Sequence, residues 1–297
     1  QANLTTNMTI EAWVNVPVGT SNINTILAKS TAGNNVQGYK FGVNEWQSGA
    51  GKLLLEAAGG TAISSTPITF GAWQHVAVVV NGNLATFYIN GQVAGSGAVA
   101  LQANTSASLT MGAFSDGSYL FNGTMDEVRL WTTSRSQSDI QSTMYSPLSG
   151  TESGLLAYYD FNQGMPYMTN TSITTLVDKT SNAWGGTLTN FPLNGMTGNF
   201  AMNSNGPAIY GSSTVCIGTT SQFGHPMSGG TWSIDGSGVT VSSTGLVTIP
   251  SSITAGTRTL SYTYTYQGCT LVDTKLITIA ASPTLSGVTT WDSSITS

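Results

Sequence analysis

Charged residues are scarce in this chain of 297 residues, because Asp, Glu, Lys and Arg together make up only 7% of it. Its surface must therefore consist mostly of Ser, Thr, Asn, Gln and Gly. The net charge of −5 argues against the basic stripe that binds nucleic acid and against an anionic membrane surface as a partner. We expect no nucleic-acid partner, and a composition of this kind is common in secreted and cell-surface proteins.

Long hydrophobic runs and cysteines are also few. The longest apolar run, "HVAVVV" (His75 to Val80), has the length of a strand and falls well short of the roughly 18 residues that cross a bilayer. We therefore expect no membrane insertion. The two cysteines, Cys216 and Cys269, lie on an expected early and late strand of a second domain. In a secreted sandwich this arrangement favours a disulfide over free thiols.

Glycine and β-formers dominate what is present. The 35 glycines and the many threonines suit strands and tight turns better than helices. Asn81-Gly82 and Asn90-Gly91 stand between apolar runs and predict two hairpins, because type I′ turns need two residues with positive φ. We expect an all-β chain with a two-sheet sandwich at 1–205, a smaller sandwich at 206–281, and a tail or linker at 282–297.

One short helix interrupts this pattern. Ser136 and Asp139 have the spacing of a capping box, with Ile140 and Met144 one turn apart behind them. The sequence predicts a helix at about 137–145.

The segment "GTMDEVRLW" (Gly123 to Trp131) holds an unusual cluster of charges. Adjacent carboxylates could serve as acid and base in glycoside hydrolysis. In a strand, however, Asp126 and Glu127 would point to opposite faces, whereas Glu127 and Arg129 would share one. We therefore predict a structural role for all three residues, an ion pair between Glu127 and Arg129, and no enzymatic activity.

The turn "DKTSNAWGGTL" (Asp178 to Leu188) is the best candidate for a metal site. Asp178, Thr180 and Asn182 place side-chain oxygens at alternate positions, as in loops that hold Ca²⁺. An Asx-turn that binds its own backbone is the alternative.

Sugar binding needs exposed aromatic rings beside amide groups. Trp46, Tyr119 and Trp184 lie next to turns and are the candidate ligand-binding residues. Trp13 and Trp73 lie inside expected strands, so they are predicted to be core residues, and His75 is predicted to be a packed strand residue.

Four segments taken together resemble a known family. They are "MTIEAWVNV", "WQHVAVVVNG…ATFYINGQ", "FNGTMDEVRLWTTSRSQSDI" and "GLLAYYDFNQG…LVDKTSNAWGGTL", and they resemble the concanavalin A-like, laminin-G-like (LamG, pentraxin-related) domains of bacterial surface proteins. The resemblance implies a jelly roll without catalysis, in which the D-E-V-R strand is structural. It also implies a frequent bound Ca²⁺, with Asp178 and Asn182 near the metal.

The segment from "GTWSIDGSGVTVSS" to "GCT" resembles the immunoglobulin-like repeats of Bacteroidota-type secreted adhesins. Members of the first family usually begin with a further strand, so the first sandwich is expected to have an unpaired edge. Three explanations are open: the chain is a fragment, another segment of the chain fills that edge, or a strand donated by a neighbouring molecule fills it. The tail, with Leu285, Val288, Trp291 and Ile295, is one conceivable donor.

The sequence therefore predicts a secreted, non-catalytic adhesion protein of the bacterial cell surface, whose partners are glycans or other surface proteins. Two alternatives remain open: a Ca²⁺-dependent, lectin-like glycan-binding module, and a subunit that self-associates into an extracellular fibre by donor-strand exchange.

Overall fold

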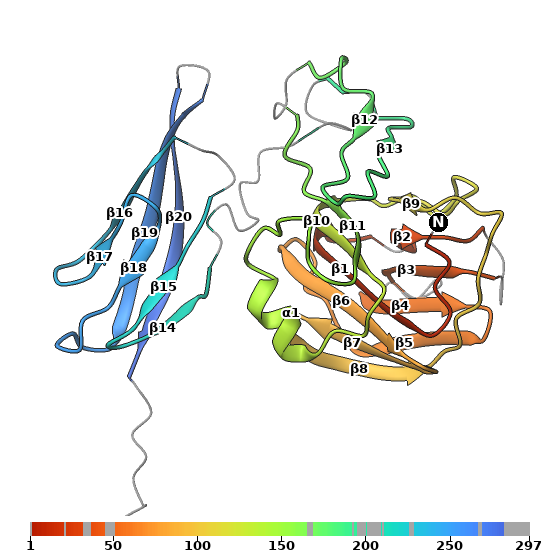
Figure 1. The fold of residues 1–297 in the computed structure, drawn as a ribbon, viewed down its shortest axis with the longest axis horizontal. Coiled ribbons are helices and arrows are strands. Elements are labelled where there is room, and N and C mark those ends of the chain that lie inside the picture. Colours follow the sequence, from red (N-terminus) through yellow and green to blue (C-terminus); the bar gives the residue numbers. More distant parts are fainter. Residues whose placement is uncertain are drawn as a thin grey trace, which may run out of the picture. The chain divides into compact units, whose positions relative to one another are not determined.

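The computed structural model describes two compact units, Gln1–Gly206 and Pro207–Ser297, shown in Figure 1. Each unit is described by itself. The residues described are 2–20, 22–31, 37–44, 51–164, 169–191, 193–194, 200, 209, 211–225, 229–266 and 269–281. The expected donor tail at 282–297 and the candidate Trp46 lie outside them. Among the described residues, no helix has the length and apolar character needed to cross a bilayer.

The first unit is a sandwich of two antiparallel sheets, which confirms the predicted fold class. Its six-stranded sheet consists, in spatial order, of β11 (Leu155–Tyr159), β10 (Thr124–Trp131), β1 (Asn7–Asn15), β6 (Gln74–Asn81), β7 (Leu84–Ile89) and β8 (Gln92–Ala98). The five-stranded sheet consists of β5 (Gly60–Pro67), β4 (Lys52–Ala57), β3 (Tyr39–Val43), β2 (Asn24–Ala28) and β9 (Thr110–Met111). A small pair, β12 (Thr175–Leu176) and β13 (Gly186–Thr187), follows.

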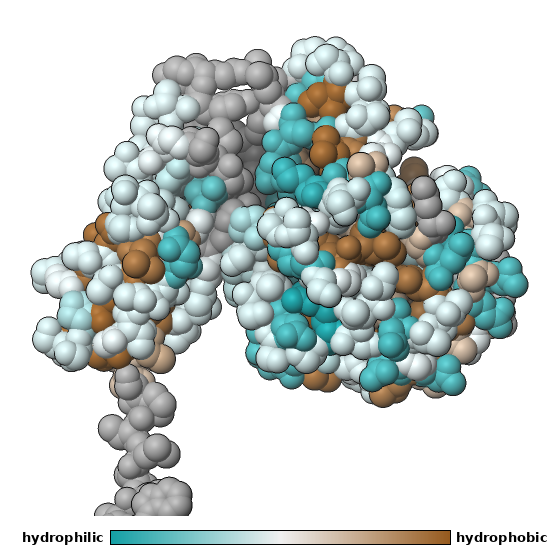
Figure 2. Space-filling model, in the orientation of Figure 1, coloured by the Kyte–Doolittle hydropathy of each residue, from teal (hydrophilic) through white to brown (hydrophobic). Residues whose placement is uncertain are grey.

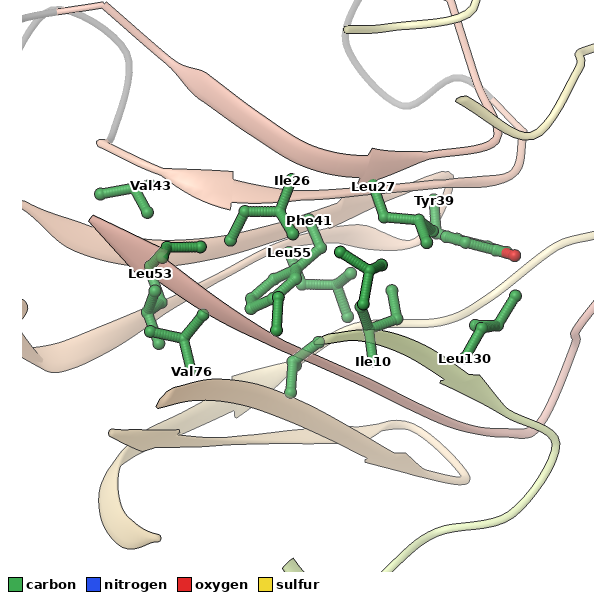
Figure 3. Packing of buried hydrophobic residues seen from close by; sticks show 14 of the residues in the cluster. Ile10, Ile26, Leu27, Tyr39, Phe41, Val43, Leu53, Leu55, Val76 and Leu130 are labelled. Atoms are coloured by element: carbon green, nitrogen blue, oxygen red, sulfur yellow. The ribbon is translucent and has the colours of Figure 1, made fainter. Parts of the chain in front are cut away.

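The core lies between the two sheets. Figure 3 shows apolar side chains from both sheets meeting in this layer, among them Phe41 and Leu55 from one sheet and Ile10, Val76 and Leu130 from the other. All are at most 1% exposed. At roughly 1.5–3 kcal/mol for each fully buried side chain of this size, this layer supplies most of the driving force for folding the unit.

Both predicted Asn-Gly hairpins are confirmed. The first hairpin joins β6 to β7 through Gly82 and Asn83, because Asn81 is still paired with Leu84. Asn90-Gly91 joins β7 to β8. Asn90 and Gly91 have φ values of 50° and 72°, as a type I′ turn requires. The helix α1 (Gln137–Thr143) is also confirmed, and it begins at a full capping box in which Ser136 and Asp139 bind each other's backbone.

A β-bulge in β10 overturns the prediction about its two carboxylates. The register pairs Arg129 with Glu11 but Asp126 with Trp13, so β10 has one residue more than β1 across this interval. Glu127 has a φ of 52° at this point, and a bulge of this kind breaks the alternation of side chains. Asp126 therefore shares the outer face of the sheet with Trp13, and Glu127 also lies there. The prediction that they point to opposite faces was wrong.

The second unit consists of two further sheets. One contains β14 (Thr214–Cys216), β20 (Cys269–Ala280), β19 (Gly256–Tyr266) and β16 (Thr231–Ile234), and the other contains β15 (Thr220–Gln222), β18 (Leu246–Thr248) and β17 (Thr240–Val241). A separate core, which includes Phe223, Leu260 and Ile277, belongs to this unit. β14 runs parallel to β20, whereas the other pairs are antiparallel. The immunoglobulin-like assignment of this unit stays a prediction.

The predicted disulfide is wrong. Cys216 is a free cysteine and pairs with Ala280 at the end of β20, whereas Cys269 begins that same strand of 12 residues. At about 3.3 Å of rise per residue, the two backbones are roughly 36 Å apart, while a disulfide needs Cα atoms within about 7 Å.

Figure 2 shows the surface in weakly polar and hydrophilic colours, with separate brown patches. This agrees with a chain in which only 7% of residues are charged. Several of its few charges are instead buried in the first unit, where they form the network described next.

Candidate functional site

The charges of "MDEVRLW" form a buried network on the outer face of the six-stranded sheet, beneath α1 and the turn after it. Arg129 donates to Glu127 Oε2 from Nη2 at 2.6 Å, which confirms the predicted ion pair. The guanidinium also donates to the carbonyl oxygens of Thr143 and Ser146. Tyr158 donates its hydroxyl to the Glu127 carboxylate at 2.8 Å. The network thus fastens the end of α1 to the sheet.

Sequence reasoning missed a second buried pair in the same layer. Arg135 donates to Glu11 Oε1 from Nη1 at 2.6 Å, and its guanidinium lies 4.1 Å from the ring of Trp131. His75 Nε2 lies 3.3 Å from Glu11 Oε2. The signal for Glu11 was present in the sequence, since it is a lone carboxylate in the apolar strand "MTIEAWVNV".

The pKa values in this layer have opposite shifts. Burial raises the pKa of Glu11, but contacts with His75, Arg129 and Arg135 outweigh it and hold the pKa at about 2. Burial lowers the pKa of His75, so this imidazole is neutral at pH 7, and it is a packed strand residue as predicted. Burial and the charge of Glu127 raise the pKa of Asp126 well above its ordinary value.

The buried charges of this layer have a structural role. Glu127 is 2% exposed, and its carboxylate is engaged by Arg129 and Tyr158. A general acid or nucleophile must reach the substrate, and Glu127 is closed off beneath the segment after α1. The bulge brings Asp126 and Glu127 onto one face, but this arrangement gives a substrate no access to Glu127.

The candidate metal ligands are held by hydrogen bonds within the protein. Asp178 Oδ1 accepts from the backbone N–H groups of Tyr158 and Thr180, and Oδ2 accepts from the Thr180 hydroxyl and the Trp184 N–H. Asn182 directs its amide N–H to the Leu156 carbonyl oxygen at 2.9 Å. Both oxygens of Asp178 thus accept hydrogen bonds within the protein.

Among the described residues, no cluster of three or more His, Cys, Asp or Glu side chains is arranged to hold a metal ion. Calcium binding by the chain stays a prediction, which a chelator experiment would test.

Trp184 is a packing residue. Its ring packs on the main core, and its carbonyl oxygen accepts from the Tyr159 hydroxyl at 2.7 Å. Tyr119 is also half-buried, and it packs against a buried cluster that includes Leu54 and Phe114, with its ring 4.7 Å from that of Phe114. Leu120 beside it is 67% exposed.

Tyr119 belongs to one end of the sandwich, at which several loops of both sheets meet. We call this the loop end, and its described residues are 16–20, 22–23, 44, 51, 68–73 and 112–123. Backbone hydrogen bonds connect three of these segments, since Gly71 donates to Val16 and Ile68 donates to Gly51, and Phe121 donates to Gly112 within its own loop. The candidate Trp46 lies outside the described residues.

Two buried asparagines fix the loop end. Asn44, with a φ of 71°, donates from its amide to the carbonyl oxygens of Thr20 and Asn22 and accepts from the Gly51 N–H. Asn24 accepts from the Asn122 N–H at 2.8 Å. Because buried side-chain amides connect three of the loops, their surface is preorganised.

The loop end also has apolar side chains, beside the hydrogen bonds of Asn24 and Asn44. Val18 is 80% exposed, and Trp73 is half-buried in the segment that leads into β6. The prediction that Trp73 is a core residue was therefore wrong, because β6 begins one residue later, at Gln74. Trp73 and Tyr119 are half-buried and Leu120 is exposed in these loops.

Comparisons with known proteins agree with this architecture. Residues 1–141 match the Laminin_G_3 family model, described as the concanavalin A-like lectin/glucanases superfamily. No curated protein matches the chain. The first unit is thus a sandwich of the concanavalin A-like type.

Solved structures share the fold at low identity. A Bacteroides ovatus protein, provisionally described as carbohydrate-binding, matches with a TM-score of 0.51 and 22% identity over 68% of this chain. This chain spans 58% of that protein's length. Domain 4 of AbnA, an extracellular GH43 arabinanase from Geobacillus stearothermophilus in complex with arabinotriose, matches with a TM-score of 0.39 and 20% identity over 48% of this chain and 68% of its own. Mouse laminin α1 domains LG4-5 match with a TM-score of 0.33 and 14% identity over 43% of this chain and 36% of theirs.

Proposed function

We propose that this chain is a non-catalytic glycan-binding module of a secreted cell-surface protein, and that the loop end of the first unit holds the ligand. The observation that carries the proposal is the presence of exposed or half-buried apolar side chains, among them Trp73, Tyr119 and Leu120, in the loops of a concanavalin A-like sandwich. The description of the Bacteroides ovatus protein as carbohydrate-binding supports this choice of ligand class. Adhesion would follow where the glycan belongs to another cell or surface.

The chemistry of the loop end suits a sugar. A pyranose ring presents an apolar face of C–H groups and an edge of hydroxyls, so it needs an aromatic or aliphatic surface beside hydrogen-bonding groups. Trp73 and Tyr119 supply the rings, and the amide-rich frame around Asn24 and Asn44 supplies rigid loops. Binding residues carried on loops above a rigid sandwich are a common arrangement.

The burial of Glu127 supports a non-catalytic role. Glu127 is buried under the segment after α1, and no sugar at the loop end could use it as a nucleophile. Incubation of the chain with the glycans that it binds should therefore release no reducing sugar. Hydrolysis that disappears in the variant Glu127→Gln would contradict this part of the proposal.

The full chain, applied to a glycan array with calcium and again with chelator, tests the binding. We expect at least one glycan class to bind, and the variants Trp73→Ala and Leu120→Asp to weaken that binding about tenfold or more, since a central contact typically contributes more than 1.4 kcal/mol. Leu84→Ala is the matched control, because Leu84 is 50% exposed at the start of β7, at the opposite end of the sandwich. No bound glycan under either condition would overturn the proposal.

A further inference from the structure

The chain has only eight lysines and arginines, and all eight lie within the residues that the structure describes. Their positions bear on the ligand of the loop end, because a sugar carboxylate or sulfate that leaves water needs a cation to compensate its charge. Lysine and arginine supply such a cation, and arginine also matches a carboxylate with two parallel hydrogen bonds. The location of the eight therefore indicates which class of glycan the loop end accepts.

The three arginines are used elsewhere in the fold. Arg129 is buried and pairs with Glu127, and Arg135 pairs with Glu11. Both lie in the charged layer beneath α1. Arg258 belongs to β19 in the second unit. Since these are all the arginines of the chain, the loop end has no guanidinium for a bidentate contact with an acidic sugar.

Four of the five lysines also lie outside the loop end. Lys29 follows the end of β2 that points away from it, and donates to a backbone carbonyl oxygen at 2.7 Å. Lys40 lies near the start of β3 and pairs with a carboxylate of β4 at 2.8 Å. Lys179 pairs with the carboxylate that directly follows β11, and Lys275 belongs to β20 in the second unit.

Lys52 follows Gly51 and is the lysine nearest to the loop end in sequence. Leu53 and Leu55 face the main core, so the alternation along β4 directs Lys52 to the outer face of the five-stranded sheet. Lys52 is half-buried on that face. It is therefore the cation that a variant must remove to test whether the loop end recognises an anion.

The described residues of the loop end have a single charged side chain, the exposed carboxylate of Asp116. Residues 45–50, which lie outside the described residues, contain a further carboxylate in sequence but no lysine or arginine. The exposed polar side chains of the loop end are neutral amides and hydroxyls, among them Asn22, Thr69 and Asn122. The loop end thus offers neutral hydrogen-bonding groups and a negative charge.

We infer, on the basis of the proposed function, that the loop end selects neutral glycans over glycans that carry carboxylate or sulfate groups. A neutral sugar can exchange its hydrogen bonds with water for bonds with amides and hydroxyls. An anionic group would lose its hydration without gaining a cation, and it would approach the carboxylate of Asp116. The net charge of −5 adds a repulsion at longer range.

Matched pairs of glycans test this selection on the full chain. Each pair shares its sugars and linkages and differs in one charged group, as in galactosides with and without a 3-sulfate and glucans with and without oxidation of C6 to the carboxylate. We expect the neutral member of each bound pair to bind about tenfold more tightly or better. Raising the salt from about 0.05 to 0.5 M should change its affinity by less than about twofold, since salt screens only charges. Each titration is done with calcium and again with chelator.

Three variants locate the source of the selection. Asp116→Lys should raise the affinity for the acidic member about tenfold at low salt. Asp116→Asn, which keeps the Oδ1 acceptor of the Ser118 N–H, should raise it by about threefold or less. Lys52→Gln is the matched control for a cation near the loop end, and it should leave the preference for the neutral member unchanged.

Equal or tighter binding of the acidic members, with calcium or with chelator, would overturn the selection of neutral glycans and leave the proposed function standing. The same holds for acidic-glycan binding that Lys52→Gln abolishes, and for a folded Asp116→Lys variant that gains none. If no glycan binds, the proposed function itself fails, and the selection fails with it. Circular dichroism of each variant confirms that a changed preference is not a changed fold.

Discussion

Arg129 and Glu127, two residues apart in β10, form an ion pair of 2.6 Å between Nη2 and Oε2 in a layer where both side chains are at most 3% exposed. Without its partner, either charge would remain buried and uncompensated. The pair therefore explains why a chain with few charges concentrates several of them at the bulge of one strand.

Removal of this guanidinium should be costly. We expect Arg129→Met to lower the free energy of unfolding by about 3–5 kcal/mol, because it leaves the Glu127 carboxylate buried without a cation. Urea denaturation measures the change. Lys179→Met is the control, since the ion pair of Lys179 with Asp160 is 44% exposed on the lysine side and should contribute about 0–1 kcal/mol. Equal losses in the two variants would contradict the structural role of Arg129.

Glu11 predicts a dependence of stability on pH. Its pKa is about 2 in the folded chain against an ordinary value of 4.5, so the folded state binds the proton more weakly than the unfolded state. The stabilisation, about 3 kcal/mol for a shift of this size, is present above pH 4.5 and is lost as the pH falls toward 2. The loss of stability caused by Glu11→Gln should therefore shrink between pH 7 and pH 2.5. A constant difference across that range would argue against the low pKa.

Asp126 should behave in the opposite way. Burial and the neighbouring Glu127 raise its pKa, so ionisation is easier in the unfolded chain, and this group destabilises the fold as the pH rises above the unfolded pKa. Asp126→Asn should thus raise the melting temperature at pH 7 and have little effect below pH 3.8. A lower melting temperature at pH 7 would show that the ionised carboxylate is needed.

A substitution of Asp178 distinguishes a structural role of its carboxylate from a role as a calcium ligand. We expect Asp178→Ala to lower the free energy of unfolding by about 3 kcal/mol, because it leaves buried backbone N–H groups without an acceptor. The loss should be the same with calcium and with chelator. If calcium instead raises the melting temperature of the wild type and not that of Asp178→Ala, then the carboxylate is a ligand after all.

Local sequence patterns predicted much of the fold. The capping box at Ser136 and Asp139 and the turn at Asn90-Gly91 depend on neighbouring residues, so the sequence predicts them well. The apolar strands likewise predicted a sandwich. The bulge at Glu127 was not predicted, because nothing in the sequence indicates that a glutamate will adopt a positive φ.

The other features that the sequence did not predict depend on contacts between residues far apart in the chain. The contact of Arg135 with Glu11 joins residues separated by 124 positions, and only tertiary structure brings them together. The disulfide prediction failed for a related reason. It depended on two strand ends lying side by side, whereas Cys216 and Cys269 lie at opposite ends of β20.

The candidate site was predicted in part. Tyr119 and Trp184 each pack against a buried cluster, so their role as ligand-binding residues stays a prediction. Trp73 was assigned to the core because the strand pattern of β6 extends back to it in sequence, although the strand begins only at Gln74.

The central claim is that the loop end binds a glycan. Isothermal titration of the full chain with the best glycan from the array, compared between wild type, Trp73→Ala and Leu84→Ala, tests it most directly. We predict saturable binding with one site per chain, weakened about tenfold or more by Trp73→Ala, as expected for a central aromatic contact, and unchanged by Leu84→Ala. Binding that Trp73→Ala leaves intact, in a variant that is fully folded, would contradict the account.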